Sequence, residues 1–254
     1  MRIGIFDSGI GGLTVLQEAL KEFPEADYIY YADTKNVPYG VKSREEVEGL
    51  VLQAADFLYT KDIEALLVAC NTATSIGIEK LREKYNIPVI GMEPAVKLAI
   101  EKGKNKKILV MATALTLKED KFKKLVHLNH GDFRVYGLPM PDLVTYGEEK
   151  NFFGEEVIKY IEESLAQYNL EEFGTLVLGC THFIYFKEII RKLIPEDIEI
   201  IDGNLGTVRN LMSKVKKEGL ENKKGKVEFF SSSKEGKNLD FKDYLIFLEN
   251  NNFS

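Results

Sequence analysis

Residues 2–13 read RIGIFDSGIGGL, and this stretch decides the fold. Its apolar start ends at an acid, which predicts a buried strand over residues 2–6. Three glycines follow at Gly9, Gly11 and Gly12, and the apolar spacing from Leu13 onward predicts a helix. A strand that enters a helix through a glycine-rich turn is the first half of a βαβ unit, so the stretch favours a parallel sheet.

Short apolar runs and longer helical patterns alternate along nearly the whole chain. One helical stripe runs over residues 47–58, after a plausible N-cap at Ser43 with Glu46 at capping-box spacing. A second stripe over residues 183–193 predicts another helix with a core-facing side. Further strands are expected at residues 27–31, 65–69, 88–90, 107–111, 133–136, 175–178 and 199–201, and a last strand and helix are candidates at 227–230 and around 241–248.

The two halves of the chain parallel each other. Residues 3–8 (IGIFDS) match residues 108–113 (ILVMAT), and residues 66–70 (LLVAC) match residues 176–180 (LVLGC). The basic segment KGKNKK at residues 102–107 indicates a solvated connection, with a boundary near residues 95–105. We therefore expect an α/β fold of two pseudo-symmetric, doubly wound domains with mainly parallel sheets. One domain is expected over residues 98–206 and the other over 1–97. The sequence permits the last segment, about 207–254, to return and complete the domain of residues 1–97.

The composition excludes several classes of protein. The 254 residues can bury a large core, and the 34 Lys and Arg against 40 Asp and Glu give a net charge of -6. This balance excludes a footprint for nucleic acid or an anionic membrane. No run has the roughly 20 apolar residues that a membrane helix needs, and the early acid argues against a secretory signal, so we expect a cytoplasmic protein.

The chain has only two cysteines, Cys70 and Cys180, and each follows an apolar strand and precedes a predicted helix. A helix N-terminus stabilises a thiolate and lowers the thiol pKa from about 8.5, so each cysteine is a candidate base. A lone cysteine is more often a small buried residue, but two at equivalent positions favour a chemical role. Two cysteines are fewer than a disulfide framework would use, and a metal site is disfavoured because Cys70 has no CxxC partner or histidine at ligand spacing. His182 lies two residues after Cys180 and is placed to orient or protonate it.

Four segments follow predicted strands, where ligands bind in open parallel sheets: residues 7–12, 33–40, 70–74 and 180–182. The first is neither a Walker A loop nor a dinucleotide fingerprint. The polar side chains in these segments are mostly hydroxyls and amides, which suit a small dianion such as an acidic amino acid. Two bases in related halves suit a reaction that removes an α-proton from one face and returns one to the other.

Together, FDSGIGGLT at residues 6–14, YAD at 31–33 with PYG at 38–40, VACNTAT at 68–74 and LGCTHF at 178–183 resemble the aspartate/glutamate racemase family. The resemblance runs in order from residue 1 to about residue 203. It implies a racemase without cofactor or metal that uses two thiols to convert L-glutamate to D-glutamate for peptidoglycan. It also implies an active site in the interdomain cleft, a homodimer and a C-terminal segment that returns to the first domain.

By position, the resemblance implies that Cys70 deprotonates D-glutamate with the help of Asp7, and that Cys180 deprotonates L-glutamate with the help of His182. The residues implied to hold the carboxylates and the amino group of the substrate are Asp7, Ser8, Tyr39, Gly40, Asn71, Thr72, Thr181 and His182.

The chain departs from the family pattern in its second half. Related sequences carry a Pro-Leu-Val-Glu stretch whose glutamate supports the second thiol, whereas residues 142–145 read DLVT here. Three alternatives stay open: Glu148 substitutes, Glu149 substitutes, or the reaction does not need this carboxylate. None of these residues joins the predicted site.

Other functions remain as alternatives. The nearest is a racemase of aspartate or another small amino acid, followed by a cysteine-dependent decarboxylase or cis–trans isomerase of the same family. A hydrolase built on Cys180 and His182 would leave Cys70 without a role, and a module that only binds amino acids would explain neither thiol.

Overall fold

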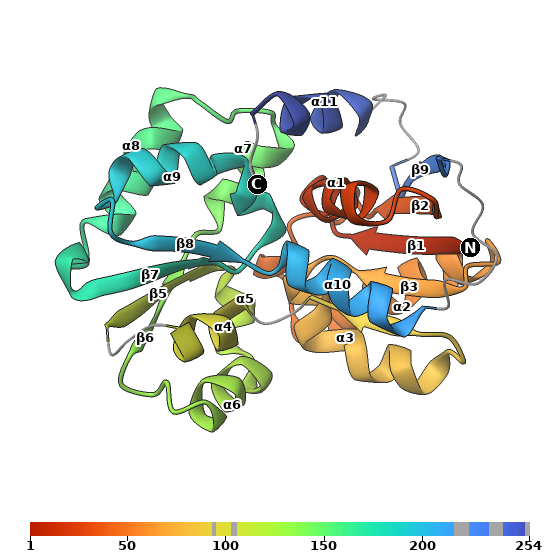
Figure 1. Cartoon of the computed structure of the whole chain (residues 1–254), viewed down its shortest axis with the longest axis horizontal. Helices are drawn as coiled ribbons and strands as arrows, with labels where there is room; N and C mark the ends of the chain where they lie inside the picture. Colours follow the sequence, from red (N-terminus) through yellow and green to blue (C-terminus); the bar gives the residue numbers. More distant parts are fainter. Residues whose placement is uncertain (93–94, 103–105, 216–223, 234–240, 252–254) are drawn as a thin grey trace.

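A computed structural model describes residues 1–92, 95–102, 106–215, 224–233 and 241–251, which form two α/β halves side by side (Figure 1). The first sheet has the strand order β4-β3-β1-β2-β9, and the second has the order β6-β5-β7-β8. All strand pairs in both sheets are parallel. The strands are β1 Arg2–Asp7, β2 Asp27–Ala32, β3 Ala65–Val68, β4 Val89–Gly91, β5 Lys107–Ala112, β6 Val135–Pro139, β7 Phe173–Leu178, β8 Glu199–Asp202 and β9 Val227–Ser231.

Helices connect the strands. The α-helices are α1 Leu13–Glu22, α2 Arg44–Tyr59, α3 Asn71–Lys84, α4 Ala95–Lys102, α5 Ala114–Lys118, α6 Asp120–Leu128, α7 Asp142–Glu148, α8 Glu155–Leu165, α9 Lys187–Leu193, α10 Asn204–Lys214 and α11 Phe241–Asn251. The described residues also include the short 3₁₀ segments η1 Tyr39–Val41, η2 Leu170–Glu172 and η3 Thr181–Phe186. In the described part of the chain, no helix is both long and apolar enough to cross a membrane.

The two sheets share one topology. The order β4-β3-β1-β2 repeats as β8-β7-β5-β6, so β1 corresponds to β5 and β3 corresponds to β7. In sheets of this kind, ligands bind beyond the carboxyl ends of the strands where the strand order reverses, here between β1 and β3 and between β5 and β7. The expected pseudo-symmetric α/β fold is confirmed.

Burial explains why the central strands can be recognised from the sequence. All four residues of β3 are buried, as are five of the six residues of β1 and of β5. Central strands of a parallel sheet are covered by helices on both faces and read as continuous apolar runs. The edge strand β6 has one buried residue among five, which leaves a weaker signal.

The chain returns to the first sheet after completing the second. Strand β9 pairs with β2, and α10 packs against α1. Helix α11 lies across the junction of the two halves in Figure 1, where the Tyr244 hydroxyl donates to the backbone oxygen of Glu148 at 3.3 Å. The expected solvated connection at residues 102–107 includes residues 103–105, and the charged tail includes residues 216–223, 234–240 and 252–254. These residues lie outside the described ones.

Two local predictions need correction. The strand expected at residues 133–136 begins at Val135, because the amides of Arg134 and Val135 both donate to the carbonyl of Gly131 in a turn, which leaves Phe133 92% exposed. The single helix expected over residues 183–193 divides into η3 and α9. Its apolar positions still face the core, so the burial pattern was right and the helix type was wrong.

The predicted N-cap of α2 is confirmed. The Ser43 hydroxyl accepts from the Glu46 amide at 3.2 Å, which satisfies one of the amides left free at the start of the helix. Glu46 itself pairs with Lys42 instead of closing the capping box.

Candidate active site

The glycine-rich turn after β1 brings the two halves together. Gly9 donates its amide to Oδ1 of Asp7 at 2.8 Å, which fixes the carboxylate at the mouth of the sheet. A Cβ on Gly11 would lie 2.4 Å from Oγ1 of Thr181, and a Cβ on Gly9 would lie on the carboxylate of Glu148. These glycines therefore let residues of the second half approach the first.

Cys70 forms one half of the candidate site. It caps α3, and its Sγ accepts from the Ala73 amide at 3.4 Å. The Ser8 hydroxyl lies 3.6 Å from this sulfur and 3.4 Å from Oδ1 of Asp7. Cys70 and Asp7 are 6% and 0% exposed, so this group of side chains is closed off from water.

The expectation that the helix N-terminus lowers the thiol pKa is wrong for Cys70. Burial raises the pKa of Cys70 to about 12, and the nearby charge of Asp7 raises it further. Hydrogen bonds from Ala73 and Ser8 act in the opposite direction but are outweighed. The free protein therefore holds Cys70 as a thiol rather than a thiolate.

Asp7 is shared by both halves. Burial raises the pKa of Asp7 to about 6, against the lowering effects of His182 and of hydrogen bonds from Gly9 and Thr181. The Thr181 hydroxyl, next to Cys180 in sequence, donates to Oδ2 of Asp7 at 3.1 Å. A carboxyl group with this pKa can take or release a proton near neutral pH.

Cys180 forms the other half of the candidate site. It precedes the 3₁₀ segment η3 rather than an α-helix, so its predicted place at an α-helix N-terminus is wrong. Its Sγ lies 3.9 Å from Nδ1 of His182, and Nε2 of the same ring lies 2.7 Å from Oε1 of Glu148. Burial opposes protonation of the imidazole, but the hydrogen bonds to Cys180 and Glu148 outweigh it and hold the pKa of His182 well above its usual value.

Glu148 is the residue that sequence reasoning left out of the site. Of the two candidate carboxylates, Glu148 reaches His182, whereas Glu149 is exposed. Thr145, at the position of the family's glutamate, is exposed as well. Its Oε1 also accepts from the Ile10 amide at 2.8 Å, which ties it to the glycine-rich turn. Residue 148 lies one helical turn after residue 145 on α7, and this i, i+3 spacing was the available signal.

A cluster of threonine hydroxyls also joins the two halves, at the start of α3. Thr72 at the start of α3 lies 3.0 Å from Oγ1 of Thr113 and 3.2 Å from Oγ1 of Thr116. A Cβ on Gly40 would lie 2.6 Å from Cβ of Thr113, so Gly40 also lies at this junction. Thr116 did not enter the sequence analysis, because a threonine in a short helix carries no distinctive pattern.

Two of the residues predicted to bind the ligand, Tyr39 and Asn71, have no hydrogen bond to either thiol or to its acid–base partners among the described residues. The Tyr39 hydroxyl donates to Oδ2 of Asp33 at 2.6 Å, so this hydroxyl already has a partner. Asn71 is the first residue of α3, next to Cys70, and its carbonyl accepts from Ser75.

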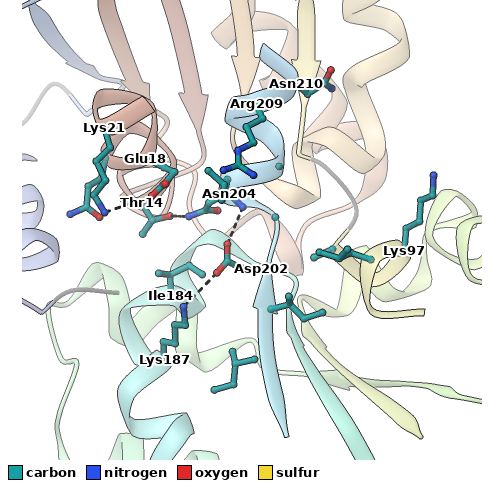
Figure 2. Close-up of a pocket in the computed structure, with 18 of the residues that line it drawn as sticks. Thr14, Glu18, Lys21, Lys97, Ile184, Lys187, Asp202, Asn204, Arg209 and Asn210 are labelled. Atoms are coloured by element: carbon teal, nitrogen blue, oxygen red, sulfur yellow. Dashed lines mark hydrogen bonds and ion pairs between the residues drawn. The ribbon is translucent and has the colours of Figure 1, made fainter. Parts of the chain in front are cut away.

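Two cavities lie beside this region. One of about 730 Å³ lies between α1, α4, α9 and α10 and is lined by Lys21, Lys97, Lys187 and Asp202 among others (Figure 2). None of the predicted site residues is among the described residues that line it. A second cavity of about 580 Å³ includes Asn71, Thr116 and Gly179 in its lining and so borders the thiol region. Within the described ranges, no group of three or more His, Cys, Asp or Glu residues could hold a metal ion.

Comparison with known proteins decides the family. The family model of Asp/Glu/Hydantoin racemases matches residues 9–211. The chain belongs to the Asp/Glu/Hydantoin racemase family. It is an amino-acid racemase, and therefore an isomerase.

Members of this family resemble the chain over nearly its whole length. The glutamate racemase of Halothermothrix orenii is 52% identical over 98% of this chain and 99% of its own. The crystal structure of the glutamate racemase from Campylobacter jejuni subsp. jejuni has a TM-score of 0.84 at 31% identity and covers 98% of both chains. The Francisella tularensis glutamate racemase, solved in complex with D-glutamate, has a TM-score of 0.83 at 30% identity over 97% of this chain and 93% of that one.

Proposed function

We propose that this protein interconverts L- and D-glutamate with two thiols that act from opposite faces of the α-carbon. The observation that carries the proposal is the pairing of each buried cysteine with its own acid–base partners. Cys70 neighbours Ser8 and Asp7, and Cys180 neighbours His182. The glutamate-specific names of the relatives support this choice of substrate.

In the L-to-D direction, the Cys180 thiolate removes the α-proton and the electron pair stays on the α-carbon. The Cys70 thiol then delivers its proton to the opposite face, so that one S–H bond forms as another breaks. The pKa of His182 is raised well above its usual value, so this ring can hold a positive charge 3.9 Å from the Cys180 sulfur. The D-to-L direction uses the same groups with the roles exchanged, as an acid–base pair must.

The substrate-binding set follows from the residues around the thiols. We propose that Ser8, Asn71, Thr72 and Thr181 bind the carboxylates and the amino group, with Gly40 and the backbone of Tyr39 completing the site. Thr113 and Thr116 join this set because their hydroxyls contact Thr72. Asp7 and His182 contribute to binding as charged neighbours of the substrate.

The proposal includes a division of the chain into two domains and an opening motion between them. We propose that residues 1–97 with about 207–254 form one domain and residues 98–206 the other, which the pairing of β9 with β2 supports. Both cysteines are under 8% exposed, so glutamate enters when the domains separate. The Arg44–Glu119 ion pair, which joins α2 to the turn between α5 and α6, then opens.

We further propose that the D-glutamate supplies peptidoglycan synthesis in the cytoplasm and that the enzyme works as a homodimer without a cofactor. These statements rest on the family resemblance. Light scattering of the purified protein measures the oligomeric state, and a monomer at working concentration would remove the dimer from the proposal.

The first experiment is incubation of the purified protein with L-glutamate in D₂O without added cofactor. We expect optical rotation to decay to zero and deuterium to appear at the α-carbon of the product. If the optical rotation of glutamate is retained but that of aspartate decays, the substrate is aspartate and not glutamate. No change with either amino acid would remove the racemase mechanism.

A further inference from the structure

Ser8 stands between the thiol and the carboxyl group of the first half-site. Its Oγ lies 3.6 Å from Sγ of Cys70 and 3.4 Å from Oδ1 of Asp7. Within the described residues, no hydrogen bond joins Asp7 directly to Cys70. Any proton that passes between these two buried groups along hydrogen bonds therefore passes through the Ser8 hydroxyl.

The surroundings hold Ser8 and Asp7 in this arrangement. The Gly9 amide and the Thr181 hydroxyl donate to different oxygens of Asp7 and fix the plane of the carboxylate. The Tyr30 hydroxyl donates to the carbonyl of Gly9 at 2.6 Å and holds the turn in place. Ser8 is 4% exposed, so bulk water does not replace its hydroxyl in this chain of contacts.

The Cys70 thiol and the Asp7 carboxyl group need a path along which a proton can move between them. Cys70 is held as a thiol in the free protein, yet it must be a thiolate to remove a proton from D-glutamate. Asp7 is the nearby group that ionises near neutral pH. Its carboxylate is a weaker base than the Cys70 thiolate of the free protein, so the proton moves to it only while the α-ammonium group of bound substrate stabilises the thiolate. A hydroxyl suits the position between them because it accepts one hydrogen bond while it donates another.

We propose that Ser8 is a proton relay that converts Cys70 to its thiolate by passing a proton to Asp7. The Cys70 S–H proton moves to Oγ of Ser8 as the Ser8 O–H proton moves to Oδ1 of Asp7. The products are a Cys70 thiolate, an unchanged serine hydroxyl and a neutral Asp7, so charge and atoms balance. The proposal rests on the proposed two-thiol racemisation and adds a role for Ser8 beyond substrate binding.

The test compares Ser8→Ala with Ser8→Thr, which keeps a hydroxyl. The matched control is Ser164→Ala, a buried serine in α8 that donates to the carbonyl of Tyr160 and touches neither thiol. We expect Ser8→Ala to lower kcat about 100-fold, Ser8→Thr to recover part of the loss, and Ser164→Ala to match the wild type.

Isotope effects distinguish a relay from a binding role. The two enantiomers have equal free energy, so kcat/KM falls equally in both directions and cannot locate the defect. A relay defect slows proton removal at Cys70, so the α-deuterium isotope effect on kcat/KM rises for D-glutamate and falls for L-glutamate. A higher KM with unchanged isotope effects would assign Ser8 to binding alone and overturn the relay.

A second measurement does not depend on racemisation. Cys180→Ser leaves Cys70 as the only thiol of the chain, so its alkylation by iodoacetamide can be followed against pH. We expect Ser8→Ala in this background to slow alkylation at neutral pH, where the buried thiol must first lose its proton, and Ser164→Ala to leave the rate unchanged. An unchanged alkylation rate in the Ser8 variant overturns the relay, whereas a wild-type enzyme that fails to racemise glutamate overturns the proposed function instead.

Discussion

Oε1 of Glu148 lies 2.7 Å from Nε2 of His182, and this contact directs the opposite nitrogen of the ring toward Cys180. The same oxygen accepts the Ile10 amide from the glycine-rich turn of the first half. Glu148 therefore favours the protonated form of the His182 ring and fixes its orientation, and it does so from a position that also contacts the first half. The arrangement couples the protonation of His182 to the packing of the halves.

Glu148→Gln removes the charge but keeps a similar shape and an acceptor oxygen. We expect kcat to fall about 100-fold, because a neutral partner no longer holds His182 protonated beside the thiol. Steady-state racemisation by circular dichroism measures the effect. Glu149→Gln is the matched control, since that side chain is exposed, and it should retain full activity. The opposite pattern, with only the Glu149 variant impaired, would mean that the contact with His182 does not serve the reaction.

Replacing either cysteine by serine tests whether both thiols react. We expect Cys70→Ser and Cys180→Ser each to lower kcat by about 100-fold or more, because a serine hydroxyl is a far weaker acid and base than a thiol. Both variants should keep the wild-type melting temperature within a few degrees, since serine is slightly smaller and its neighbours already accept a polar group. Full turnover in the Cys70 variant would contradict the two-thiol mechanism and leave Cys180 and His182 as a pair of another kind.

The ionisation of Asp7 predicts an acid limb in the pH profile. The pKa of Asp7 is raised by burial to about 6, and only the ionised form can accept a proton. We expect kcat/KM for D-glutamate to be full above this pH and to fall as pH drops through about 6. Asp7→Asn should lose most of the turnover and abolish the limb. A limb that persists in the residual activity of this variant would belong to another group.

The same ionisation costs stability. A carboxyl group whose pKa rises on folding from 3.8 to about 6 binds its proton more tightly in the folded state, so its contribution to stability falls as pH rises through this range. Two pH units correspond to about 3 kcal/mol, which Asp7→Asn should recover in part at pH 8 but not at pH 4. Urea unfolding gives the free energy of unfolding of both proteins at pH 4 and pH 8. The other acids titrate in both proteins, so their effect cancels in the difference between the two. A pH-independent difference between them would contradict the raised pKa.

The fold could be predicted because the buried central strands have sequences that are almost entirely apolar. Strands β1, β3, β5 and β7 are buried on both faces and appear as continuous apolar runs, whatever their surroundings. The edge strand β6 carries little of that signal, and the turn at Gly131 that shifts its start is a backbone feature with no apolar pattern.

The site was predictable where it follows strand ends and less so elsewhere. Cys70 and Cys180 follow β3 and β7, and parallel strands bring their carboxyl ends to one edge. The direction of the Cys70 pKa shift depends on the depth of burial, which local sequence does not encode. Glu148 reaches His182 from the end of another helix, a contact of |i−j| = 34 that needs the assembled fold.

Gly40 of the first half lies close to Thr113 of the second half, and Gly40→Ala tests whether the reaction needs this contact. An added Cβ would lie 2.6 Å from Cβ and 2.8 Å from Cγ2 of Thr113, so one half must move away from the other. We expect kcat/KM to fall at least tenfold while the melting temperature changes little, because the strain is relieved by opening rather than by unfolding. The matched control is Gly49→Ala in α2, where nothing lies within 4 Å of the new Cβ. That change should raise stability by about 0.5–1 kcal/mol and leave activity unchanged, since alanine is the better helix residue. Equal activity in both variants would mean that the reaction does not require the close contact of Gly40 with Thr113.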